Sequence, residues 1–110
     1  MRYIKVGTTA DVAPGHLKKI FLEDAEVLLA HLDDGFYAIS DKCPHMGGSL
    51  SAGRLEGGAI RCPRHGALID IKTGKVLEDP KMLFMKAKAH HEVKIYTLKI
   101  KGTDIEICQG

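Results

Sequence analysis

The segments Cys43-Pro44-His45 and Cys62-Pro63-Arg64-His65 decide how this 110-residue chain is interpreted. Each motif offers one thiolate and one imidazole, and sixteen residues (46–61) separate the two motifs. Four ligands of two kinds can therefore meet at one site, and this donor set suits either a zinc ion or an iron–sulfur cluster with mixed ligands. The choice between these two cofactors determines which function the sequence predicts.

The residues around both motifs favour tight loops that are rich in backbone donors. A regular strand or helix cannot direct a cysteine and a histidine one or two residues apart toward one metal without strain, whereas a tight loop can. Pro44 and Pro63 stiffen the chain directly after each cysteine, and Gly47, Gly48 and Gly66 let backbone N–H groups approach the site. Bridging sulfides carry negative charge and need such donors, while zinc fingers pair like ligands rather than mixed ones. The loops therefore favour iron–sulfur over zinc.

Outside the motifs, the pattern of apolar runs and turn residues predicts one all-β domain over residues 1–110. The expected strands and hairpins cover 3–6, 17–22, 26–32, 36–39, 55–60, 68–77, 93–100 and 105–107. A change in apolar parity predicts a bulge near Tyr96-Thr97 in the late strand. One segment differs, because residues 81–92 contain no glycine, proline or β-branched residue and follow Asp79-Pro80, a pair suited to a helix start. We expect one short helix near residues 80–91.

The stretches C-P-H-M-G-G-S-L and C-P-R-H-G-A-L-I-D resemble the two motifs of the Rieske [2Fe-2S] family, C-x-H and C-x-x-H at a similar separation. This resemblance implies a Rieske-type antiparallel β-sandwich with a small cluster-binding subdomain at about residues 41–78. It also implies one [2Fe-2S] cluster per chain, with Cys43 and Cys62 bound to one iron and His45 and His65 bound to the other.

Within the family, the chain resembles the low-potential members. High-potential members carry an extra cysteine in each loop, joined as a disulfide, but the corresponding stretches here are 46–48 and 63–64, without cysteine. Those members also place serine and tyrosine donors where this chain has Ala67 and Ile69. Fewer donors favour the oxidised cluster, so we expect a potential on the order of −150 mV.

The resemblance implies a soluble Rieske-type ferredoxin, a one-electron carrier that turns over no substrate itself. Its expected partners are a flavin-containing reductase and an oxygenase or similar acceptor. Two alternatives remain open, namely a small zinc-binding interaction module and a small subunit of a larger redox enzyme such as nitrite reductase.

Composition and charge indicate which binding partners and which cellular compartment to expect for this carrier. A net charge of +2 is too balanced to indicate nucleic-acid binding, and no apolar run approaches the roughly 18 residues of a membrane span. The third cysteine, Cys108, is left over from the four-ligand set, and an odd thiol favours the reducing cytoplasm.

Several other polar residues have two interpretations. His16, His31, His90 and His91 are better explained as structural or surface residues than as ligands, although His90-His91 falls where many relatives have a loop covering the cluster. Lys42, Arg61 and Arg64 flank the ligands. They form either a solvated charge set or a basic rim on which an acidic partner docks.

Overall fold

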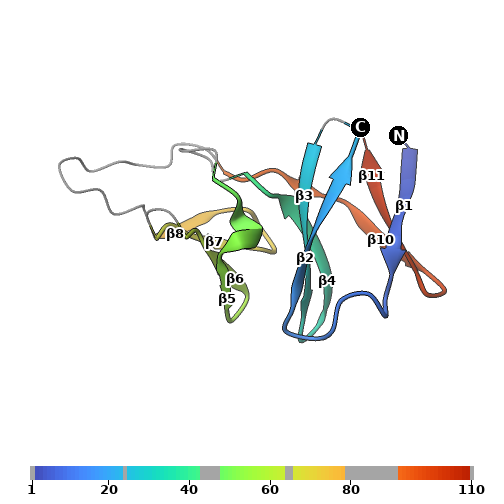
Figure 1. Ribbon diagram of the computed structural model, residues 1–110, viewed down its shortest axis with the longest axis horizontal. Coiled ribbons are helices and arrows are strands. Elements are labelled where there is room, and N and C mark those ends of the chain that lie inside the picture. Colours follow the sequence, from blue (N-terminus) through green and yellow to red (C-terminus); the bar gives the residue numbers. More distant parts are fainter. Residues whose placement is uncertain (1, 24, 43–47, 64–65, 79–91, 110) are drawn as a thin grey trace.

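The computed structural model describes residues 2–23, 25–42, 48–63, 66–78 and 92–109 (Figure 1). All strand pairings among these residues are antiparallel. The elements are β1 (Arg2–Thr8), β2 (Leu17–Leu22), β3 (Ala25–Leu32), β4 (Gly35–Ser40), the 3-10 helix η1 (Leu50–Ala52), β5 (Arg54–Glu56), β6 (Ala59–Arg61), β7 (Leu68–Asp70), β8 (Val76–Glu78), β9 (Ile95–Tyr96), β10 (Leu98–Lys101) and β11 (Asp104–Gln109).

The strands of the described residues form three sheets arranged as two lobes. One sheet has the order β1-β11-β10, the second β2-β3-β4-β9, and the third β5-β6-β7-β8. The first two sheets pack together as a sandwich, the base lobe, on the right of Figure 1. The third sheet and η1 form the second lobe on the left. The all-β antiparallel fold predicted from the sequence is therefore confirmed.

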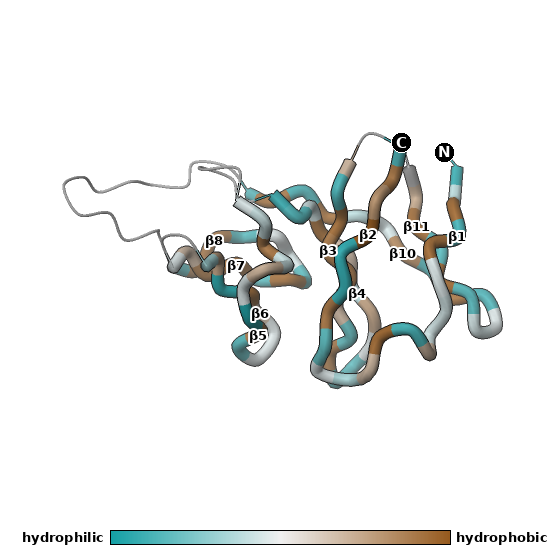
Figure 2. Tube along the Cα trace, in the orientation of Figure 1, coloured by the Kyte–Doolittle hydropathy of each residue, from teal (hydrophilic) through white to brown (hydrophobic). Residues whose placement is uncertain are grey.

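Strand β3 is buried on both faces and contributes side chains to the hydrophobic cores of both lobes. Val27 and Leu29 pack in the core of the sandwich, beside Ile105 and Ile107 of β11. Leu28 and the alternate residues that follow it face the other way, into a core that contains residues of η1, β6 and β7. A strand with two buried faces has no polar side, which explains the nearly continuous apolar run of its sequence. Figure 2 shows hydrophobic segments, in brown, within both lobes.

The late strand differs from its prediction. The sequence predicted one strand over 93–100 with a bulge near Tyr96-Thr97, but the strand is divided at Thr97. Strand β9 pairs with β4 in one sheet, and β10 pairs with β11 in the other. The change of apolar parity therefore marks the point where the chain passes between sheets, and the Thr97 carbonyl still accepts the Cys108 N–H at 2.8 Å.

The other predicted strands and the hairpins around Asp34-Gly35, Gly57-Gly58 and Thr73-Gly74 are present. The predicted helix near 80–91 lies outside the described residues. Within the part of the chain that the structure describes, no helix has the length and apolar character that a membrane crossing requires.

Candidate metal centre

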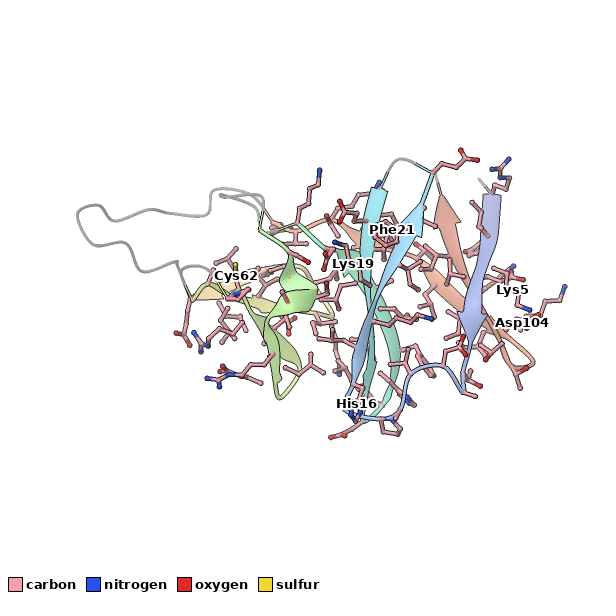
Figure 3. The ribbon with its side chains drawn as sticks, in the orientation of Figure 1. Lys5, His16, Lys19, Phe21, Cys62 and Asp104 are labelled. Atoms are coloured by element: carbon pink, nitrogen blue, oxygen red, sulfur yellow. The ribbon has the colours of Figure 1, made fainter. Side chains whose placement is uncertain are left out.

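Cys62 lies at the base of the second motif loop, directly after β6 (Figure 3). Its N–H donates to the Ala67 carbonyl at 2.8 Å, and its own carbonyl accepts the Gly66 N–H at 3.2 Å. Gly66 has a φ of 78°, a left-handed conformation that favours glycine, so the tight return of the loop depends on this residue. Cys62 is 1% exposed, shares its core cluster with Leu50 and Ala67, and forms no disulfide.

The first motif loop is closed at its base by Asp41, whose side chain is 1% exposed. Lys42 and Ser49 pair as an antiparallel bridge, which brings the two ends of the loop together. The main-chain carbonyl of Asp41 accepts the Leu50 N–H at 2.6 Å. Its carboxylate accepts the Ser49 hydroxyl at 2.5 Å and the Ser51 N–H at 2.6 Å. The buried carboxylate of Asp41, just before the loop, is thus hydrogen-bonded to Ser49 and Ser51, just after it.

A lysine of the base lobe completes the surroundings of this carboxylate. The Lys19 ammonium lies 3.6 Å from Asp41 and 2.5 Å from Glu26. Hydrogen bonding to Glu26, together with the nearby charge of Asp41, raises the pKa of Lys19. The buried negative charge therefore has a cationic neighbour that remains protonated at neutral pH.

The bases of the two loops lie against one another at Gly53. A Cβ atom at this position would lie 1.9 Å from the Arg61 carbonyl oxygen, a backbone atom that cannot move aside. Gly53 follows η1 directly, and Arg61 directly precedes Cys62. A pocket opens at this junction and is lined by both segments, including Ala52 and Pro63. The close approach of the two segments therefore places the ends of both motif loops side by side.

Arg61 occupies the centre of a network of hydrogen bonds and is 25% exposed. Its guanidinium bonds both carboxylate oxygens of Glu56, at 2.6 and 2.9 Å, and both of Glu78, at 3.3 Å. It also donates to the Gly66 carbonyl at 2.7 Å. The guanidinium lowers the pKa of Glu56, and the two carboxylates raise the pKa of Arg61. For Arg61, this pairing favours a role inside the domain over the basic rim; Lys42 is exposed, and Arg64 lies outside the described residues.

Of the four predicted ligands, the structure describes Cys62, while Cys43, His45 and His65 lie outside the described residues. Two of the other histidines bind main-chain carbonyls: His16 Nδ1 lies 3.2 Å from the Pro14 oxygen, and His31 Nδ1 lies 2.7 Å from the Val12 oxygen. The His31 ring also stacks on Phe36, with centroids 3.9 Å apart. These contacts support a structural role for both histidines.

The described part of the site fits an iron–sulfur cluster. Cys62 is a buried thiol without a disulfide partner, and it stands at the base of a tight loop whose return requires glycine. A thiolate is the ligand that iron–sulfur clusters use, and burial shields a cluster from water. The same residue suits zinc equally well on ligand chemistry alone.

Comparison with known families separates these cofactors. Residues 2–87 match the model of the Rieske [2Fe-2S] domain. The chain belongs to the Rieske family. The cofactor of this Rieske domain is accordingly a [2Fe-2S] cluster, as the two motifs predicted, and the zinc alternative is not supported.

Individual relatives agree with this family. The Rieske domain is 36% identical over 110 residues to the 3-phenylpropionate/cinnamic acid dioxygenase ferredoxin subunit of Shigella boydii, covering 97% of this chain and 93% of the relative. It is 39% identical over 70 residues to apoptosis-inducing factor 3 of Homo sapiens, but these residues are 64% of this chain and span only 12% of that protein. Among solved structures, the ferredoxin of carbazole 1,9a-dioxygenase from Nocardioides aromaticivorans IC177 has a TM-score of 0.85 at 26% identity, with both chains fully covered.

Sequence reasoning missed the residues that hold the loop bases. Asp41, Glu56 and Glu78 look like ordinary surface carboxylates in the sequence, since nothing in their spacing relates them to the motifs. Gly53 is one of twelve glycines. The one signal that the sequence offers is the closeness of Asp41 and Arg61 to the motifs, and it does not distinguish a structural role from a docking role.

Proposed function

We propose that this chain is a one-electron carrier, a Rieske-type ferredoxin that accepts an electron from a flavin-containing reductase and delivers it to an oxygenase component or a similar redox enzyme. The observation that supports it most directly is the buried thiol of Cys62 at the base of a closed loop, within a chain that matches the Rieske domain. The full-length likeness to a dioxygenase ferredoxin subunit supports the choice of partner. The carrier itself turns over no substrate in this proposal.

We assign the ligands as Cys43 and Cys62 on one iron and His45 and His65 on the other, with residues 41–78 as the cluster-binding subdomain. When bound, the cluster supplies a site that gains and loses one electron. The chain holds that site through the loop bases at Asp41 and Cys62, where backbone hydrogen bonds fix the ends of each loop. Burial of Cys62 excludes water from the thiolate. We place the carrier in the cytoplasm, where its third cysteine, Cys108, stays reduced.

The absorption spectrum, metal content and EPR spectrum of the purified protein test this function. We expect a red-brown protein with about two irons and two sulfides per chain and an EPR signal only after reduction. The chemically reduced protein should transfer one electron per chain to cytochrome c in a stopped-flow mixing experiment. A colourless protein that contains zinc would refute the proposal.

Ligand variants test the assignment of residues. Alanine at Cys43, His45, Cys62 or His65 should abolish cluster binding, because each substitution removes one ligand. Cys108→Ala is the matched control, since Cys108 is also buried but lies in β11 of the base lobe. A control variant that loses the cluster, or a ligand variant that keeps a normal spectrum, would show that the assignment is wrong.

The potential is a separate test of the low-potential class. A redox titration followed by EPR should give a midpoint on the order of −150 mV. A positive midpoint would contradict the expectation drawn from Ala67 and Ile69.

A further inference from the structure

We propose that Arg61 is the positioning residue of the second cluster-binding loop, and that its guanidinium acts as a non-covalent brace that holds Gly66 and so keeps the loop from Cys62 to His65 in its binding geometry. This inference rests on the proposed ligand assignment. It concerns a residue that touches neither the cluster nor a partner in the proposal and acts through the loop alone.

The guanidinium uses every N–H that it has. Nε donates to Glu56, Nη1 donates to Gly66 and Glu78, and Nη2 donates to Glu56 and Glu78. The five donors of arginine form a rigid planar fork, so bonds on all sides leave the group one orientation. Because the bonds to Glu56 and Glu78 hold the guanidinium in place, its bond to the Gly66 carbonyl can fix the position of Gly66.

The two carboxylates come from opposite edges of the sheet. Glu56 ends β5 and Glu78 ends β8, and these are the outer strands of the order β5-β6-β7-β8. Arg61 stands on β6 between them, opposite Leu68, which in turn pairs with Glu78. The guanidinium therefore links residues of the two outer strands and is anchored to structure outside the loop.

The bond to Gly66 transmits this anchorage to the loop. Gly66 binds the Cys62 carbonyl through its N–H and binds Arg61 through its carbonyl, so both of its peptide groups are held. Among the described residues, Arg61 provides the side-chain hydrogen bond to the base of this loop. Neither motif loop carries the extra cysteine that a bracing disulfide would need, so a polar brace has a purpose here.

Arg54 provides a matched comparison on the same sheet. It is the register partner of Arg61 on β5, carries the same charge and contacts the same Glu56, at 3.6 Å. Its side chain is 81% exposed, against 25% for Arg61. Among the described residues, no hydrogen bond joins the Arg54 side chain to the loop. Variants at the two positions therefore each remove one positive charge beside Glu56, and the Arg61 variant also removes the bond to Gly66.

The test compares Arg61→Gln with Arg54→Gln in the cluster-loaded protein. The half-life of the visible absorbance in the presence of an iron chelator measures cluster retention. We expect Arg61→Gln to lose its cluster roughly ten times faster than the parent, the effect typical of residues that orient metal ligands, and Arg54→Gln to stay within about twofold. Far-UV circular dichroism at the start of the assay shows whether each variant is folded.

Two further readouts separate positioning from a general loss of stability. The EPR g values and midpoint potential of the cluster that remains should shift in Arg61→Gln, because the loop geometry around the iron has changed, and should not shift in Arg54→Gln. Arg61→Lys keeps the charge but not the fork, so it should not restore the parent's half-life.

Glu78→Gln keeps Arg61 but weakens its hydrogen bonds to residue 78. This variant tests the proposal if Arg61→Gln does not fold. We expect it to lose its cluster faster than the parent and more slowly than a folded Arg61→Gln. Parental half-life and g values in folded Arg61→Gln, or in Glu78→Gln where Arg61→Gln is unfolded, would overturn the brace, as would full rescue by Arg61→Lys. A parent protein that binds no cluster at all would instead refute the proposed function, and the two failures are therefore distinguishable.

Discussion

Replacement of Asp41 by alanine should open the base of the first motif loop. The carboxylate of Asp41 is buried and accepts two hydrogen bonds, from the Ser49 hydroxyl and the Ser51 N–H. Alanine removes both acceptors and leaves the Ser51 N–H without its partner. The main-chain bond from Leu50 to the residue 41 carbonyl is retained, so the effect belongs to the side chain.

The size of the effect follows from these two bonds. A hydrogen bond to a charged group contributes about 1.5–3 kcal/mol to stability, so two such bonds contribute about 3–6 kcal/mol. The Ser49 hydroxyl keeps the Ser51 hydroxyl as a neighbour at 2.9 Å, which offsets part of the loss. We therefore expect local opening to become easier by about 3 kcal/mol, or roughly 150-fold at 1.4 kcal/mol per tenfold.

Hydrogen–deuterium exchange measured by mass spectrometry on the cluster-loaded protein tests this value. A peptide that covers residues 48–53 reports the Ser51 amide, and its slowest-exchanging amide should exchange roughly 150-fold faster in Asp41→Ala, as the local opening energy falls. Asp41→Asn keeps one carbonyl acceptor, so its exchange should lie between that of the parent and that of the alanine variant. Peptides from β11 should be unchanged, because the loop lies in the other lobe.

Asp34→Ala is the control for loss of a carboxylate as such, since Asp34 forms an exposed ion pair with Lys72. It should leave exchange in residues 48–53 unaltered. An Asp41→Ala variant with exchange within about threefold of the parent, less than 1 kcal/mol, would show that the carboxylate does not hold the loop.

Three more predictions concern the contacts around the two lobes. Gly53→Ala should lower the cluster content and the thermal midpoint because its Cβ would meet a backbone carbonyl at 1.9 Å, whereas Gly58→Ala, with nothing within 4 Å, should match the parent in both measurements. Gly74→Ala should lower the thermal midpoint more than Gly102→Ala; both glycines have positive φ, but only the former would meet a backbone oxygen, at 2.1 Å, so equal losses would contradict the packing argument. Asp34→Asn should lower the thermal midpoint at neutral pH, because the ion pair with Lys72 lowers the pKa of Asp34. This stabilisation is complete above the ordinary pKa of 3.8 and is lost as the pH falls through the lower pKa of the folded state. A difference in thermal midpoint from the parent that persists in stronger acid would exclude this ion pair as its cause.

The strands and the donor set were accessible from the sequence because both depend on local patterns. Turn residues such as Asp34-Gly35 and Gly57-Gly58 lie between apolar runs, and each marks a hairpin that the structure contains. The two motifs identify their own chemistry, since few cofactors use mixed cysteine and histidine pairs.

The residues that hold the loops could not be predicted from the sequence, because their roles depend on partners distant in the sequence. Arg61 meets Glu78 seventeen positions away, and its charge alone suggested a docking rim. Asp41, which directly follows β4, lies 3.6 Å from Lys19 of β2, twenty-two positions earlier in the sequence. The passage between sheets at Thr97 appeared in the sequence only as a change of parity, which a bulge explains equally well.

The two buried faces of β3 have a consequence for moving this redox centre into another protein. Leu28 belongs to the apolar core shared with η1, β6 and β7, while its neighbours Val27 and Leu29 belong to the core of the sandwich. A fragment cut at residues 41–78 would leave that shared core half solvated and would carry no strand to cover it. A transplantable unit must therefore include the β3–β4 hairpin, and a host scaffold must offer an apolar sheet face to receive its far side.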